Sequence, residues 1–328
     1  MKKKRDIAID GIRGLAVICM MYAHLIPHYQ ENGTKLFFFE RIISSLAAPL
    51  FLFLVGYNFN IHQVFVNLLK RVFVTLIIAA IIDTFIWNIF PFYSFDVLYI
   101  IGFSLIFIFL IKNLKQQIML LLILFITLSS SIIQYLGYYS ISLYEPYFNQ
   151  EYKVLHVIYN FFINGWFPFF PWIIFPIIGL VTKNINFENK KHKALSISIF
   201  VCTITIICFY TNFDWRTFAV EIFYPASFQY LILSFSYIYF IWVNKQIFYY
   251  KFLGFLTQFG KLSLLIYILH LTIYSFLGDL LISRFPNRFY CFIFVICCFW
   301  FILFLINNNK FKWKVFQKNT YVRILLGN

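Results

Sequence analysis

Charge is scarce in this sequence. Charged residues make up only 12% of the 328 positions, and acidic residues number 12 against 27 lysines and arginines. A soluble domain of this length needs a polar surface, which so few charges cannot supply. The low charge content therefore excludes an ordinary water-soluble fold.

Cysteine is also sparse, and its spacing suggests no bonding role. The six thiols show neither the paired spacing of zinc ligands nor the pattern of a disulfide framework. All of them fall inside apolar runs, where we expect packing thiols. They are Cys19, Cys202, Cys208, Cys291, Cys297 and Cys298. No metal is expected.

Apolar residues fill most of the chain. They make up 62% of it, and the mean hydropathy is +0.81. An apolar run of about 20 residues predicts a transmembrane helix, because that length crosses the hydrocarbon core. We therefore expect an all-α polytopic membrane bundle, with about ten transmembrane helices in a single domain over residues 1–328. The ten windows lie at roughly 10–28, 44–61, 72–90, 95–111, 117–136, 166–182, 195–212, 225–243, 262–282 and 289–306.

The basic residues predict the orientation of these spans. With the N-terminus inside, 20 of the 27 lysines and arginines fall on cytoplasmic segments and 6 fall outside, with Arg13 left in the membrane. This asymmetry favours cytoplasmic N- and C-termini. The charges are scattered between spans rather than gathered in one patch, so we expect no nucleic-acid partner. The longest break, 137–165, is predicted to be an external loop, and His62, His156 and His192 to be solvated loop residues.

Ionisable side chains inside the spans need a reason, because each costs about 2.5–3.5 kcal/mol on insertion scales. The first span carries Arg13 and His24, which are eleven residues and about three helical turns apart and so share one face. Asp10 and His28 extend this stripe by one turn at either end. One interpretation is a topology anchor, with His24 bonded to a neighbouring helix. Four polar residues on one face favour a functional cleft instead.

Later spans add further candidates. Asp83 has no obvious partner on its own helix, so pairing with Arg13 and orienting a histidine are both open. Ser263, Tyr267 and His270 share one face of the ninth span, which we expect to pack against the polar stripe of the first. Asp279 lies farther along the same span. Three prolines follow Trp166 in the sixth window, which indicates either a kinked helix or a cavity.

The opening of the chain resembles a known superfamily of membrane acyltransferases. Residues 5–24 read RDIAIDGIRGLAVICMMYAH, in which an arginine, ten residues and a histidine share the first span. That superfamily includes acyltransferase family 3 and the relatives of heparan-α-glucosaminide N-acetyltransferase. Later blocks are similar to bacterial members of the second group. These blocks start at Ala48, Phe95, Phe167, Tyr224 and Phe259. Val55 stands where family 3 often has serine, which also favours the second group.

The resemblance implies transfer of an acyl group, usually acetyl, from cytoplasmic acyl-CoA to a carbohydrate of the cell envelope. His24 is then the candidate general base or acylated nucleophile, and Asp83 and His270 are further catalytic candidates. Arg13 and Asp10 would hold the phosphate or carbonyl end of the donor. The donor's nucleotide would be attracted by Lys70 and Arg71, and by Lys190 and Lys191. The candidates for acceptor binding are His28, Tyr267 and Trp166.

Expected partners are therefore membrane lipid, acyl-CoA and a carbohydrate acceptor, and the sequence is compatible with a homodimer. The resemblance implies a bacterial inner membrane. Two other function classes compete with the enzyme. A transporter or flippase would use the polar stripe as a path, but the expected repeat of broken helices is not evident. A glycan polymerase would be expected to have a larger external loop.

Overall fold

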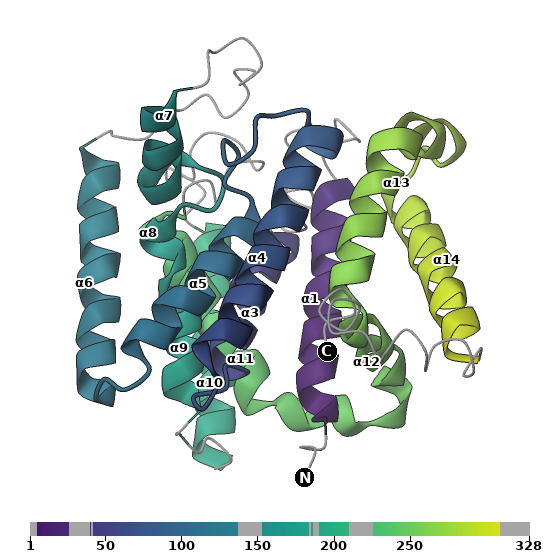
Figure 1. Cartoon of the computed structure of the whole chain (residues 1–328). Helices are drawn as coiled ribbons and strands as arrows, with labels where there is room; N and C mark the ends of the chain where they lie inside the picture. Colours follow the sequence, from purple (N-terminus) through teal and green to yellow (C-terminus); the bar gives the residue numbers. More distant parts are fainter. Residues whose placement is uncertain are drawn as a thin grey trace. The chain divides into compact units, whose positions relative to one another are not determined.

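The computed structural model describes residues 5–25, 40, 42–136, 153–183, 185, 190–209 and 226–308, with the backbone alone at 134, 207–209 and 306–308. Every regular element within these ranges is helical (Figure 1). Clustering of the chain separates two compact units. The first joins Met1–Ala48 to Asn244–Asn328, and the second is Pro49–Val243.

The described helices confirm a polytopic helical membrane bundle. Six are long and apolar enough to cross a membrane: Ile7–Leu25, Phe65–Trp87, Gln116–Ile133, Val154–Thr182, Ser263–Arg284 and Arg288–Leu305. Three shorter apolar helices are Ile42–Asn58, Val97–Ile111 and Phe228–Val243. A further helix, α10 (Lys190–Phe209), contains the described part of the seventh predicted window, residues 195–209. Every predicted window therefore coincides with a helix, although the boundaries differ.

The first unit is built around the N-terminal helix α1 (Ile7–Leu25). Asp6 starts this helix, because its carboxylate accepts a hydrogen bond of 2.9 Å from the amide of Ala8. The helix packs against segments from the other end of the chain (Figure 1). These are η5 (Lys245–Tyr249), α12 (Gly254–Lys261), α13 (Ser263–Arg284) and α14 (Arg288–Asn308), with η6 (Lys251–Leu253) preceding α12.

Glycines bring α1 and α12 into direct backbone contact. A Cβ atom at Gly14 would overlap the carbonyl group of Leu256, and one at Gly260 would overlap the carbonyl oxygen of Asp10. Small residues at such crossings allow two helices in a membrane to approach closely. The segment of α1 around Asp10 therefore lies directly against the backbone of α12. A side chain larger than glycine at Gly14 or Gly260 would force the two helices apart.

The second unit contains the central part of the chain. Its helix α4 (Phe65–Ile82) packs against α5 (Val97–Ile111), α10 packs against α11 (Phe228–Val243), and α6 (Gln116–Tyr135) packs against α8 (Phe169–Trp172) and α9 (Ile174–Thr182). Glycines also join α3 (Ala47–Tyr57) to α9, since a Cβ at Gly56 would overlap the carbonyl of Pro176. Gly56 thus allows the two helices to approach closely. The remaining elements are η2 (Asp83–Trp87), α7 (Val154–Tyr159) and η4 (Asn160–Asn164).

Two irregular segments of the second unit lie side by side. Between η2 and α5, three residues other than glycine have positive φ: Asn88, Phe92 and Phe95. The amides of Trp166 and Phe167 donate to the carbonyls of Ser94 and Phe95, at 2.7 and 3.0 Å. The proline-rich sixth window is itself interrupted, because Phe170 has a non-helical conformation between two short helices. Of the two interpretations of these prolines, the kinked helix is therefore observed, while the cavity stays a prediction.

Several predicted loop residues lie on helices instead. Of the predicted loop 137–165, residues 137–152 lie outside the described part of the chain, and Val154–Asn164 is helical. His156 therefore lies on α7, and His192 lies on α10 with its Nδ1 2.9 Å from the hydroxyl of Tyr239. Hydropathy windows stop at the first polar residues, whereas a helix can continue beyond the apolar core. His62 does lie in an exposed turn, as expected.

Candidate functional site

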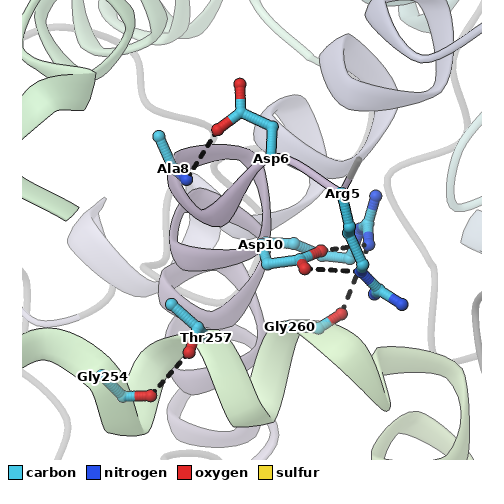
Figure 2. A network of polar contacts seen from close by, with 8 residues as sticks. Arg5, Asp6, Ala8, Asp10, Gly254, Thr257 and Gly260 are labelled. Carbon is cyan, nitrogen blue, oxygen red and sulfur yellow. Dashed lines mark hydrogen bonds and ion pairs between the residues drawn. The ribbon is translucent and has the colours of Figure 1, made fainter. Parts of the chain in front are cut away.

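The N-terminal end of α1 carries a shared ion pair (Figure 2). The carboxylate of Asp10, which is buried, accepts from Nε of Arg5 at 2.5 Å and from Nη1 of Arg13 at 3.1 Å. The same Nη1 lies 3.4 Å from the carbonyl oxygen of Gly260, near the C-terminal end of α12. Negative charge favours the start of a helix and positive charge its end, so each group lies where the helix dipoles stabilise it.

Asp10 and Arg13, one turn apart, therefore share the helix face that was predicted for them, and they form an ion pair on it. Arg5 was not predicted as a site residue, because its charge was attributed to membrane topology. Its distance from Asp10 along the chain is five residues, and it precedes Asp6, the residue that caps the helix. Nothing in a helical pattern places Arg5 on the stripe, so only the folded chain identifies it.

The C-terminal end of α1 carries a histidine that pairs with a second histidine on α13. Nδ1 of His24 lies 2.8 Å from Nε2 of His270 on α13, and the two rings are nearly parallel, with 7° between their planes. His270 is fully buried, and its Nδ1 lies 2.8 Å from the carbonyl oxygen of Ile266. The expected packing of the ninth span against the polar stripe of the first is confirmed by this contact.

The hydrogen-bond partners determine which nitrogen carries the hydrogen when both rings are neutral. A carbonyl oxygen only accepts, so Nδ1 of His270 must carry the hydrogen. Nε2 of the neutral His270 ring is then an acceptor, and Nδ1 of His24 must donate to it. Neutral His24 is therefore left with its lone pair on Nε2. That nitrogen is the one able to take a proton or an acyl group.

Aromatic rings surround His270 on its own helix. Tyr267 and Tyr274 each place a ring 5.7 Å from the imidazole, at steep interplanar angles of 67° and 88°. Both tyrosines are buried. Tyr267, expected to bind the acceptor, therefore contacts the histidine pair through His270. Asp279, farther along the same helix, is exposed.

Asp83 belongs to the second unit, where it is fully buried. Its carboxylate accepts from the hydroxyls of Ser94 and Tyr99 at 2.5 and 2.8 Å, and from the amide of Phe92 at 3.2 Å. These bonds hold the irregular segment that precedes α5. The partners that the sequence did not reveal are thus Phe92, Ser94 and Tyr99, which follow η2 along the chain. A catalytic role for Asp83 stays a prediction.

The remaining predicted residues are dispersed. Lys70 and Arg71 are exposed on the second turn of α4, not in a loop, and Lys190 and Lys191 open α10. Trp166 is half-buried in the second unit and packs edge-to-face against Trp87, with ring centroids 5.2 Å apart. His28 lies outside the described residues.

A second ion pair in the first unit was not anticipated as part of a site. Nε of Arg288, at the start of α14, lies 2.7 Å from a carboxylate oxygen of Glu40, and the arginine is buried. Tyr22 on α1 packs against Phe292 on α14, with ring centroids 4.6 Å apart. The pairing joins residues 248 positions apart, so no local pattern could have indicated it.

Comparison with known proteins identifies the family. A model of the catalytic region of heparan-α-glucosaminide N-acetyltransferase matches residues 5–214, which is more than half of the chain. No curated protein and no solved structure gives a significant match. The matched region includes Arg5, Asp10, Arg13 and His24, whereas His270 lies beyond it. The chain belongs to the family defined by the catalytic region of heparan-α-glucosaminide N-acetyltransferase.

Proposed function

We propose that this membrane acetyltransferase moves an acetyl group from acetyl-CoA to an amino or hydroxyl group of a cell-envelope saccharide. The observation that carries the proposal is the hydrogen-bonded chain from His24 through His270 to the carbonyl of Ile266. This chain presents Nε2 of His24 as a base. Family membership supports the reaction class and names a glucosaminide as the acceptor of the family's model.

In the proposed reaction His24 acts as general base. Its Nε2 takes the proton from the acceptor amine or hydroxyl as the acceptor's lone pair attacks the thioester carbonyl. The tetrahedral intermediate then loses the CoA thiolate, and His24 returns its proton to that sulfur. Throughout, Nδ1 of His24 stays bonded to His270, which keeps the imidazole oriented. Acylation of Nε2 itself is the alternative route at the same nitrogen.

The two ends of α1 suit the two substrates. The distribution of basic residues predicts that the N-terminal end of α1 is cytoplasmic, where acetyl-CoA is available. His24 lies eleven residues after Arg13, which is about 16 Å along the helix axis. The donor would therefore enter beside Arg13, and its acetyl group would be transferred near His24, toward the outer face.

The test is release of CoA by the purified protein in nanodiscs, with acetyl-CoA as donor and glucosamine as acceptor. We expect His24→Ala to lower kcat by roughly 10²–10⁴-fold, the usual contribution of a general base. His62→Ala, which removes an exposed histidine from a turn of the second unit, is the matched control and should leave the rate unchanged. A His24→Ala protein that stays folded and retains full activity would refute the assignment.

A further inference from the structure

We propose that the segment leading into α12 binds anionic phospholipids of the leaflet that surrounds the N-terminal end of α1. The contact is made by three consecutive residues, Tyr250, Lys251 and Phe252, which we name the aromatic–lysine surface. The inference concerns the lipid partner of the protein and does not depend on the proposed reaction.

The fold holds this surface at the edge of the membrane. The buried ring of Phe248 lies against Gly11, where an added Cβ would be 2.7 Å from it. The hydroxyl of Tyr249 donates a hydrogen bond of 3.1 Å to the carboxylate of Asp6, the residue that caps α1. Segment η5 therefore lies beside the first turns of α1 (Figure 1). Because α1 is long and apolar enough to cross a membrane, its first turn lies at one membrane interface, and so does the surface that follows η5.

The two aromatic rings of the surface are exposed and stacked on each other. Tyr250 is 63% exposed and Phe252 is 70% exposed, whereas the anchoring Phe248 is only 4% exposed. The ring centroids of Tyr250 and Phe252 are 6.0 Å apart, with 22° between the ring planes. Aromatic side chains that leave the core at this depth are typical of the interfacial belt, where rings lie among the lipid headgroups. The stacked pair therefore supplies affinity for the lipid surface, whatever the headgroup.

The charge of the segment selects the kind of lipid. Residues 244–262 contain three lysines, Lys245, Lys251 and Lys261, and neither aspartate nor glutamate. Lys251 is exposed between the two rings of the surface. A lysine at an interface extends its ammonium group to the level of the phosphates while its stem stays beside apolar groups. Each such lysine favours anionic over neutral lipid. The surface therefore fits a headgroup with a net negative charge.

The competing occupant is a nucleotide, because a base also stacks on aromatic rings. A site for a small molecule is concave and encloses most of its ligand. Tyr250 and Phe252 have more than half of their surface uncovered, and they stack on each other rather than leaving a slot for a base. The exposure of the two rings therefore favours an extended lipid surface over a nucleotide site.

The experiment identifies the lipids that touch the surface. In a cysteine-free background of the full chain, Phe252→Cys is labelled with bimane, and the protein is reconstituted in vesicles of equimolar phosphatidylglycerol and phosphatidylcholine. In each sample one of the two lipids carries bromine in its acyl chain near the headgroup, which quenches the fluorophore on contact. We expect brominated phosphatidylglycerol to quench more strongly than brominated phosphatidylcholine. Adding Lys251→Gln to the labelled protein should lower this preference by roughly fivefold.

The matched control is Phe301→Cys on α14, labelled in the same way. Phe301 is 56% exposed in an apolar run of the same unit, so its label should be quenched equally by the two lipids, with or without Lys251→Gln. Tyr250→Cys provides a second labelling position if Phe252→Cys does not fold, and it should show the same preference as position 252. Lys251→Glu should turn the preference toward phosphatidylcholine, because it places a negative charge between the rings.

Three outcomes would overturn the inference. A label at position 252 that is quenched by aqueous iodide, but by neither brominated lipid, would show that the surface lies in water. Equal quenching by the two lipids, unchanged by Lys251→Gln, would show lipid contact without preference for anionic headgroups. Loss of lipid quenching on addition of CoA would assign the surface to a nucleotide instead.

Discussion

Nδ1 of His24 lies 2.8 Å from Nε2 of His270, although 246 positions separate the two residues in the chain. The His270 imidazole accepts from Nδ1 of His24, as an aspartate carboxylate accepts from Nδ1 of the histidine in a Ser-His-Asp triad. Because His270 also bonds to the carbonyl of Ile266 through its other nitrogen, its role in the proposed mechanism is to position His24. Its contribution can be measured apart from that of the base.

Substitution of His270 should lower the rate less than loss of His24. We expect His270→Ala to reduce kcat by roughly one to two orders of magnitude, because His24 keeps its basic nitrogen but loses its orientation. His270→Gln places a carbonyl oxygen near the former position of Nε2 and should recover part of that loss. Steady-state kinetics of the three proteins give the comparison, with the KM for acetyl-CoA expected to stay constant. A rate unchanged in His270→Ala would remove the histidine from the mechanism.

Activity should fall as the medium is acidified. Protonation of His24 at Nε2 removes the lone pair that accepts the acceptor's proton, so the rate follows the neutral fraction of the residue. The measurement is kcat/KM for the acceptor against pH, corrected for folded protein by a thermal melt at each pH. The small residual rate of His24→Ala should lack this acid limb. A wild-type profile that stays flat would count against general-base catalysis.

The crossing of α1 and α12 should be intolerant of added atoms. Gly14→Ala places a methyl group against the backbone of Leu256 and should cost about 1–3 kcal/mol of stability, the usual cost of overpacking. Gly254 offers the matched control, because no atom lies within 4 Å of a Cβ built there. Thermal unfolding of both variants in one detergent tests this. Equal melting temperatures would show that the crossing can relax.

The Asp83→Asn variant can distinguish a structural role of Asp83 from a catalytic one. The amide can no longer accept all three hydrogen bonds from Ser94, Tyr99 and Phe92, so we expect a loss of stability of about 1–3 kcal/mol. Asp279→Asn changes an exposed carboxylate and should have little effect. The informative quantity is kcat per folded molecule. A normal value would make Asp83 purely structural, and a large decrease would support its predicted catalytic role.

The predicted orientation can be tested by cysteine labelling. In a cysteine-free background, Lys153→Cys should react with a membrane-impermeant maleimide added to intact cells, because this position is predicted to lie outside. Lys115→Cys, which precedes α6 and is predicted to be cytoplasmic, should react only after permeabilisation. Both residues are exposed in the structure, so access to the thiol is not limited by the fold. The reverse pattern would invert the topology.

Local features of the site could be predicted from the sequence. Asp10, Arg13 and His24 lie on one helix, so the helical repeat alone determined their common face, and the apolar windows located that helix. Positions of partners on other helices required the fold. No property of the segment around His270 specifies that its Nε2 meets His24, and Arg5 reaches Asp10 from outside the helix.

The largest errors came from equating polarity with loops. No predicted apolar window includes Lys70 or Arg71, yet both lie on α4, which begins five residues before Lys70. A helix can include such residues near its end because their long side chains reach the membrane interface. His192 is polar by composition but contacts Tyr239 on the neighbouring helix. A hydropathy average registers neither the reach of a side chain nor a specific partner.

The first unit joins the two ends of the chain, and this affects how the protein can be made. Helix α1 emerges from the ribosome and enters the bilayer more than 200 residues before α12, whose backbone it must contact at Gly14 and Gly260. During that interval Asp10 can neutralise Arg13 within the helix itself, since they are one turn apart. The glycine surface, however, lacks its α12 partner until Gly254–Lys261 has been synthesised. Premature termination anywhere before Asn244 would therefore leave α1 inserted but unassembled, a natural substrate for membrane quality control.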